Sequence, residues 1–253
     1  MQASNWLPGH RHCSANARCS LTSVKDKPTV MTRLVHLCFV AYVLLGSASC
    51  KGQTNSPTAS KKSSERNKII GGGCDGCEIM YVGMPAIIPS TDTSAGWNEK
   101  GERLLVAGTV YKLDGKTPAA DVVIYYWQTD NNGYYTPGDG MDEKAKRHGH
   151  IRGWVKTGKE GKYAIYSIRP APYPSGSIPA HIHLAVKEPG INNEYYIEDF
   201  LFDDDKLLVE SQRKALDNRG GSGILSVQKK DSIQIAERNI FLGLNIPGYP
   251  AAR

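Results

Sequence analysis

Two histidines one residue apart, His181 and His183, have the spacing of metal ligands. Alternate side chains of an extended strand share a face, so both imidazoles would point to one side and Ile182 to the other. The apolar residues up to Val186 favour a strand here, and Pro179 marks its beginning. Such a pair supplies half of a typical metal site, although an isolated His-x-His is also common as ordinary strand polarity.

Tyrosines in two nearby loops offer further ligands. Tyr134 and Tyr135 follow Gly133, and Tyr173 lies in the proline-stiffened segment Arg169–Pro174. A phenolate is a hard oxygen donor that suits a trivalent cation, and a bound cation can deprotonate a phenol whose free pKa is about 10. Histidines with tyrosines therefore indicate iron(III), whereas zinc favours cysteine, histidine and carboxylates. A zinc or copper site that uses the histidines alone is the alternative, and most of the 13 tyrosines are expected to serve packing.

The elements that must position these side chains are short strands. Apolar or alternating runs rich in β-branched and aromatic residues are separated by turn residues from Leu104 onward. They predict strands at residues 104–113, 121–129, 153–157, 163–168, 180–187, 195–202, 224–229 and 232–241, and one short helix at 206–216. This pattern predicts an all-β fold, an antiparallel β-sandwich with few short helices.

Five motifs in a fixed order resemble those of a known family. They are Trp127-Gln128…Gly133-x-Tyr135, Arg152-Gly153, Gly161-x-Tyr163, Arg169-Pro170-x-Pro172-Tyr173-Pro174 and Pro179-Ala180-His181-x-His183. With them, the region from Leu104 to Phe241 resembles the intradiol ring-cleavage dioxygenases, the group of protocatechuate 3,4-dioxygenase and catechol 1,2-dioxygenase. The nearest likeness is to their secreted or lipoprotein dioxygenase-like branch. The resemblance implies a β-sandwich of the intradiol dioxygenase type over residues 104–253.

The resemblance also implies a site and a reaction. Carried over by position, the family's four iron ligands fall on Tyr135, Tyr173, His181 and His183; Tyr134 is the adjacent alternative, and alignment through Gly133 favours Tyr135. Fe(3+) would activate a small aromatic diol for attack by O2, while one tyrosine leaves the metal and helps to accept a proton. The ring would open between its two hydroxylated carbons to give a muconate-type diacid.

Two positions depart from the family's pattern. The archetypal enzymes carry an arginine where this chain has Ile178, and a glutamine where it has Asp199. We expect Ile178 and Arg152 to contact the substrate and Asp199 to take part in catalysis, with Arg169 as a second source of positive charge or a structural loop anchor. A carboxylate beside a bound catecholate is repulsive unless it is protonated or paired. The alternative function is therefore a non-catalytic surface β-sandwich that binds an aromatic or polysaccharide-linked ligand.

Two further residue pairs have less specific interpretations. Cys74 and Cys77 lie in a glycine-rich loop and lack the second pair that a closed zinc site needs. A local disulfide is favoured outside the cytoplasm, with free thiols and a metal or redox role as alternatives. His148 and His150 are expected in a solvated loop, behind the ligands, or at the pocket rim.

The N-terminal part predicts export. A basic start at Met31–Arg33, a 12-residue apolar run and small residues form a signal peptide over residues 31–50, and the run is too short to span a membrane. The small residues before Cys50 resemble a bacterial lipoprotein cleavage site. We therefore expect Cys50 to be lipidated and to tether an outer-membrane lipoprotein or periplasmic protein; plain secretion after Ser49 is the alternative. Residues 1–30 are expected to be a gene-model extension or a disordered tail, residues 51–68 a polar linker, and residues 69–103 an arm that carries the CxxC loop.

The formal net charge of +6 does not predict a nucleic-acid partner. Five lysines and arginines but only one acid precede residue 50, which leaves 26 basic and 24 acidic residues in the rest of the chain. The body is thus nearly neutral, and the resemblance to the intradiol dioxygenases implies a small aromatic diol and O2 as partners. A homo-oligomer is also expected, because archetypal members of the resembled family are multimeric.

Overall fold

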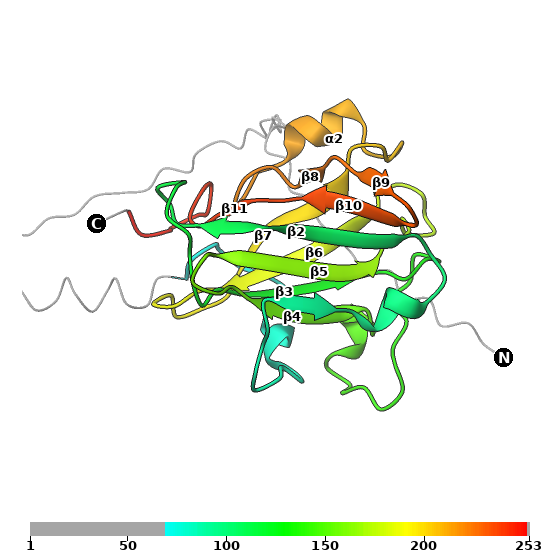
Figure 1. Cartoon of the computed structure of the whole chain (residues 1–253), viewed down its shortest axis with the longest axis horizontal. Coiled ribbons are helices and arrows are strands. Elements are labelled where there is room, and N and C mark those ends of the chain that lie inside the picture. The colour runs from blue at the N-terminus through cyan, green and yellow to red at the C-terminus, as the bar shows by residue number, and fades with distance from the viewer. Residues whose placement is uncertain (1–68, 252–253) are drawn as a thin grey trace, which may run out of the picture. The chain divides into compact units, whose positions relative to one another are not determined.

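The computed structural model describes residues 69–251, which form two β-sheets stacked face to face (Figure 1). The strands are β1 (Thr91–Thr93), β2 (Arg103–Tyr111), β3 (Val123–Gln128), β4 (Arg152–Lys156), β5 (Lys162–Ile168), β6 (His181–Lys187), β7 (Tyr195–Phe202), β8 (Ile224–Leu225), β9 (Gln228–Lys230), β10 (Ile233–Glu237) and β11 (Ile240–Phe241). Within this range the helices are α2 (Glu210–Ala215) and short 3-10 helices at Cys77–Tyr81, Ala95–Asn98 and Lys146–His148. The helix predicted at residues 206–216 is thus present in a shorter form.

The predicted β-sandwich is confirmed. Its sheets contain both parallel and antiparallel strand pairs, whereas antiparallel pairing alone was predicted. One sheet has the order β1–β5–β2–β10–β9 with β11 beside β2, and the other has the order β4–β3–β6–β7–β8. The central pairs are antiparallel, whereas β1–β5, β2–β10, β2–β11 and β7–β8 are parallel. Parallel neighbours need a long return connection, and β8 follows β7 only after the segment that carries α2.

The two strands predicted nearest the C-terminus are each divided in the structure. The chain changes sheet between Leu225 and Gln228, because β8 pairs with β7 and β9 pairs with β10. Farther on, β10 ends at Glu237, and the Oδ1 of Asn239 accepts a hydrogen bond from the Thr109 amide at 2.9 Å in place of a backbone carbonyl. The apolar pattern continues across both breaks and therefore did not indicate them.

The core lies between the two sheets and follows the alternation of the strands. On β3, Ile124 and Tyr126 point into this core, while Tyr125 and Trp127 point to the opposite face of the same sheet. Each large apolar side chain buried in this way stabilises the fold by roughly 1.5–3 kcal/mol. The remaining core side chains come from both sheets and include Leu104, Val106, Ile165, Ile182, Leu184, Val186, Ile197, Phe200, Phe202 and Ala236.

The opposite face of the β3-containing sheet is covered by the N-terminal arm. The 3-10 helix Cys77–Tyr81 places Cys77 and Met80 against Tyr125 and Trp127. The Trp154 indole Nε1 donates to the Met80 carbonyl at 2.7 Å, which fixes the helix to β4. The arm therefore belongs to the folded unit and encloses one side of the face on which the predicted ligands lie.

Several predictions concern residues outside the described range. These are the signal peptide, lipidation of Cys50, the linker and the interpretation of residues 1–30, and they stay predictions. Among residues 69–251, no helix has the length and apolar character needed to cross a membrane.

Candidate metal centre

The two histidines share a face of β6, as predicted. Ile182 and Leu184 point into the sandwich core, and His181 and His183 point to the arm-covered face, with their Nε2 atoms 3.1 Å apart. Their strand is held between β3 and β7, which makes the pair a rigid part of the second sheet.

Two loops bring tyrosines to the same point. Tyr135 follows β3 and Tyr173 follows β5, and their hydroxyl oxygens are 2.8 Å apart. The Tyr173 hydroxyl is also 3.2 Å from the His181 Nε2. Tyr134, the sequence alternative, is 57% exposed. The structure thus brings together the four residues of the predicted ligand set and places Tyr134 outside it.

Hydrogen bonds on the far side of each ring decide which nitrogen faces the cluster. The His181 Nδ1–H donates to the Pro179 carbonyl at 2.7 Å, and the His183 Nδ1–H donates to the Asp199 Oδ1 at 3.0 Å. In a neutral imidazole the other nitrogen is then an acceptor. Both Nε2 lone pairs consequently face each other at 3.1 Å, an unfavourable arrangement that a cation between them would relieve.

The donor set fits a metal ion. Ligand atoms bound at about 2 Å from an ion lie roughly 3 Å apart, and the spacings of 2.8, 3.2 and 3.1 Å along this cluster match that value. Ligand atoms of His181, His183 and Asp199 also lie within 4.8 Å of one another. Because Asp199 bonds the Nδ1 side of His183, its carboxylate is placed to orient that ligand from behind. Two phenol oxygens with two imidazole nitrogens suit a hard trivalent ion better than zinc.

Burial favours the uncharged forms of the two phenols and of His181. Burial, followed by the proximity of Tyr173 and Asp199, raises the pKa of the Tyr135 phenol well above its usual range. Burial also raises the pKa of Tyr173, although the hydrogen bond from Tyr135 opposes this shift. Burial and the neighbouring His183 lower the pKa of His181. At neutral pH both phenols are therefore protonated until a cation displaces their protons.

Asp199 is ionised and paired. Burial alone would raise the pKa of its carboxyl group, but the interactions with His183, His181 and Tyr196 outweigh burial and lower that pKa. The carboxylate that was expected beside a bound diol is thus bonded to His183, one of the predicted ligands.

Other predicted site residues have structural partners. The Arg152 guanidinium donates to the carbonyls of Ile79 and Val82 in the arm and lies over the Trp154 ring at 4.7 Å. Its contact with substrate stays a prediction that this geometry does not favour. Ile178, 41% exposed, lies just before Pro179 at the start of β6.

Arg169 has the role of a loop anchor. Its guanidinium forms two hydrogen bonds to Asp204, at 2.9 and 2.5 Å, and lies over the Phe202 ring at 4.3 Å. The loop that carries Tyr173 is thereby tied to the end of β7.

Trp127 and His148 form a stacked layer behind the ligands. The Trp127 ring stacks on both His183 and His148, with ring centroids 4.9 Å and 4.2 Å apart. His148 is buried, and its Nδ1 lies 2.8 Å from the Tyr125 hydroxyl. Of the places expected for His148, the structure thus has the one behind the predicted ligands and not the solvated loop that the basic residues before it suggested. His150, by contrast, bonds Glu99 and the Thr136 carbonyl, each at 2.6 Å.

The burial of His148 predicts an acid-sensitive fold. Burial, then the charge of Arg147, lowers its pKa from 6.5 to about 3. The unfolded chain therefore binds more protons between these values, and stability falls as the pH drops below 6.5. In the metal-free protein we expect this residue alone to remove about 2 kcal/mol of unfolding free energy between pH 6.5 and pH 5. Urea unfolding at both pH values should show a flatter pH dependence in His148→Gln.

A control comes from His150, whose pKa is shifted in the opposite direction. Burial opposes the shift, but the hydrogen bonds to Thr136 and Glu99 outweigh it and raise that pKa. The stabilisation that His150 provides is therefore present at low pH and lost as the pH rises. His150→Gln should make the loss of unfolding free energy on acidification steeper than in wild type. Equal pH slopes in wild type and His148→Gln would contradict the prediction.

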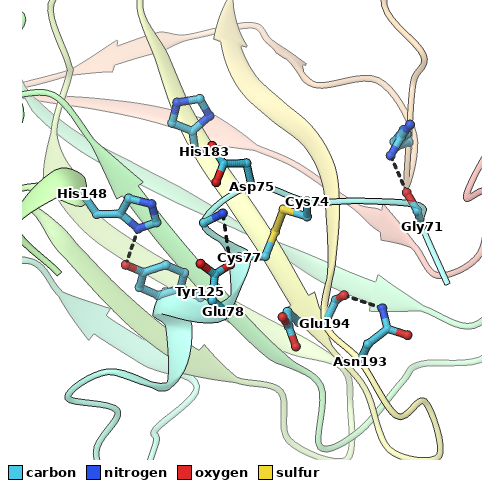
Figure 2. Close-up of a disulfide and its surroundings, with 12 residues drawn as sticks. Gly71, Cys74, Asp75, Cys77, Glu78, Tyr125, His148, His183, Asn193 and Glu194 are labelled. Carbon is cyan, nitrogen blue, oxygen red and sulfur yellow. Dashed lines mark hydrogen bonds between the residues drawn. A yellow bond between two sulfur atoms is a disulfide. The ribbon is translucent and has the colours of Figure 1, made fainter. Parts of the chain in front are cut away.

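The CxxC pair forms a disulfide beside this layer. Cys74 and Cys77 are bonded to each other, and Figure 2 shows the bridge in the arm with Tyr125, His148 and His183 around it. Cys77 is fully buried against Tyr125 and Trp127. The bridge closes the loop of the arm that lies over the stacked layer.

A cavity of about 670 Å³ elsewhere in the described chain does not contribute to the cluster. Strands β2, β5 and β10 line it, at Gly108, Tyr163 and Ala236 among others. None of its lining residues is a predicted ligand, so the chemistry belongs to the other sheet.

Comparisons with known proteins identify a family to which the chain is similar. A family model described as Dioxygenase matches residues 88–230. The chain is 31% identical over 128 residues to a hydroxyquinol 1,2-dioxygenase from Nocardioides simplex, covering 44% of this chain and 41% of that protein. It is 29% identical over 143 residues to catechol 1,2-dioxygenase 2 from Acinetobacter lwoffii, covering 46% and 50%. The chain therefore spans half or less of the length of these relatives.

A solved structure, the dioxygenase domain of a dioxygenase–carbohydrate-binding protein fusion from Streptomyces sp. SirexAA-E, is 20% identical. It aligns over 63% of this chain and 91% of that one with a TM-score of 0.46.

Proposed function

The chain belongs to the intradiol ring-cleavage dioxygenase family, and we propose that it opens the ring of a catechol-type diol with O2. The iron(III) ion for this reaction would be held by Tyr135, Tyr173, His181 and His183. The observation that carries the proposal is the pair of Nε2 acceptors that face each other beside two phenol oxygens. Catechol and hydroxyquinol, named for the relatives, are the first diols to test.

The protein's own groups have separable roles. Bound iron(III) would supply Lewis-acid activation and orientation of the diol. The two phenols, once deprotonated, would offset two of the three charges of the ion. An incoming diol must lose its hydroxyl protons, and the Tyr135 oxygen, 2.8 Å from Tyr173, is a base within this cluster that can take one of them.

The pairing of Asp199 bears on the departure from the family pattern. An unpaired carboxylate would repel a bound catecholate, whereas this one is bonded to the His183 Nδ1 at 3.0 Å. Ile178 leaves an apolar, partly exposed side chain near the start of the strand that carries the histidine ligands. These features support turnover of a diol whose substituents need no cationic partner at that position.

The test is a visible spectrum of the full chain loaded with iron(III), combined with oxygen uptake. We expect a reddish phenolate-to-iron band, and consumption of one O2 per catechol with appearance of a muconate-type product. A colourless protein that retains only zinc would overturn the proposal. A coloured protein that consumes no oxygen with any catechol would favour the non-catalytic binding function.

A further inference from the structure

The strand beside the histidine ligands carries one extra residue. In the β6–β7 pair, Ile182 is opposite Phe200 but Leu184 is opposite Ile197, so two residues of β7 face the single His183. Such a β-bulge bends the strand and re-aims its side chains. The two residues are Glu198 and Asp199, and the bulge brings Asp199 to the His183 Nδ1.

A bulge leaves backbone groups without ladder partners, and the segment Arg219–Gly223 provides them here. The Glu198 amide donates to the Arg219 carbonyl at 2.9 Å, and the Arg219 amide donates to the Glu198 Oε2 at 3.3 Å. Just beyond the bulge, the Leu201 amide donates to the Gly223 carbonyl at 2.9 Å. The bulge is therefore bonded at both ends to one segment that lies outside the metal cluster.

Gly223 packs directly on the bulge. A Cβ at this position would lie 2.0 Å from the Asp199 carbonyl oxygen and 2.8 Å from the Glu198 Cγ. The first of these contacts is with backbone, which cannot move aside as a flexible side chain could. Only glycine allows the segment to hold the bulge this closely.

Arg238 holds the same segment from the other sheet. Its Nη1 donates to the carbonyls of Gly221 and Ser222, and its side chain is only 3% exposed. Its Nε and Nη2 have no partner within the described chain. The Glu198 carboxylate supplies favourable charge nearby. A buried guanidinium that lacks some of its hydrogen bonds lowers the stability of the fold.

We propose that the segment Arg219–Gly223, held by Arg238, is a positioning device for the metal centre. It fixes the bulge so that Asp199 holds the His183 ring with its Nε2 towards the cluster. The inference rests on the proposed function for the identity of the metal, and it makes Arg238 and Gly223 positioning residues remote from the ligands. A carboxylate behind a ligand histidine fixes the ring and raises its basicity, and loss of such a partner typically costs about 10–100-fold in metal affinity.

The first experiment tests the carboxylate. Full-chain protein loaded with iron(III) is mixed with excess chelator, and the dissociation rate and visible band are recorded for Asp199→Asn and Asp199→Ala. The amide oxygen can still accept from the Nδ1–H but without charge, so we expect faster release in Asp199→Asn and release about 10–100-fold faster than wild type in Asp199→Ala. Asp203→Asn, at an exposed carboxylate just after β7, is the control and should match wild type.

The second experiment tests the device itself. Gly223→Ala should release iron faster and shift the band, as the Asp199 variants do, whereas Gly158→Ala, where no atom lies within 4 Å of the added Cβ, should not. If Gly223→Ala does not fold, Arg238→Lys, which keeps the charge but not the geometry, carries the same test. Circular dichroism and thermal unfolding separate loss of fold from loss of metal.

Folded Gly223→Ala and Arg238→Lys proteins with wild-type release rates and bands would overturn the inference. Release of zinc(II), measured in parallel with a colorimetric chelator, keeps this outcome apart from failure of the proposed function. Histidine is also a common zinc ligand. A wild-type protein without a phenolate band would contradict the iron assignment, while the zinc release rates would still test the positioning role of the segment.

Discussion

Tyr135→Phe is expected to lower the rate of catechol ring cleavage by about two orders of magnitude or more and to weaken and shift the phenolate-to-iron band. Its hydroxyl oxygen, 2.8 Å from that of Tyr173, is one of the four converging donors. Loss of a residue behind a metal ligand already costs about 10–100-fold, and a direct donor that also accepts a proton should cost more. Oxygen uptake and the visible spectrum of the iron-loaded variant measure both effects.

The neighbouring Tyr134 is the matched control. It has the same chemistry, but its side chain is 57% exposed and lies outside the cluster. Tyr134→Phe should therefore keep the band and lower the cleavage rate by less than about twofold, since surface substitutions of this kind change little. If Tyr134→Phe instead lost the colour and Tyr135→Phe kept it, the ligand assignment would be wrong.

Gly133→Ala is expected to separate the two tyrosine-bearing loops. Gly133 has a φ of +83°, and a Cβ there would lie 2.1 Å from the Pro172 carbonyl oxygen. The left-handed backbone costs a non-glycine residue about 1–2 kcal/mol. The contact forces the loop of Tyr135 away from that of Tyr173, so we expect a total loss of about 2–4 kcal/mol of unfolding free energy together with weaker iron binding. Urea unfolding and iron titration measure the two effects.

Gly140→Ala isolates the cost of the backbone conformation. Its φ is +70°, but no atom lies within 4 Å of the added Cβ. It should lose only the conformational term, about 1–2 kcal/mol, and bind iron as wild type does. Equal iron binding in both alanine variants would show that close packing of Gly133 on Pro172 does not position the tyrosines.

Much of the fold and of the ligand set could be predicted from local sequence. Strand alternation is a property of the backbone, so the common face of His181 and His183 followed from their spacing. The tyrosines came from the resemblance, carried by Gly133 and the prolines around Tyr173, and the structure brings both hydroxyls to the histidines. Breaks such as the one at Asn239 could not be predicted, because the apolar pattern continues through them.

The partners of the charged residues could not be predicted in the same way. Arg152 was expected at the substrate, but the arm, about 70 residues earlier in the chain, supplies carbonyls for its guanidinium. His148 was expected in a solvated loop, behind the ligands or at the pocket rim, and it is buried because the Trp127 ring and Gly76 of the arm pack against it. Each of these contacts joins segments that are separated in the sequence, and local sequence patterns do not indicate such contacts.

The sequence by itself determined the sandwich, the strand that carries the histidines and the residue types that favour iron(III), because these depend on periodicity and on the chemistry of single side chains. The tertiary structure decided what Asp199 does. A one-residue bulge in β7, held by a segment some twenty residues later, turns its carboxylate to the His183 Nδ1. Register between strands depends on packing across the sheet. This is why a carboxylate that was expected to repel the substrate is instead bonded to His183, one of the predicted metal ligands.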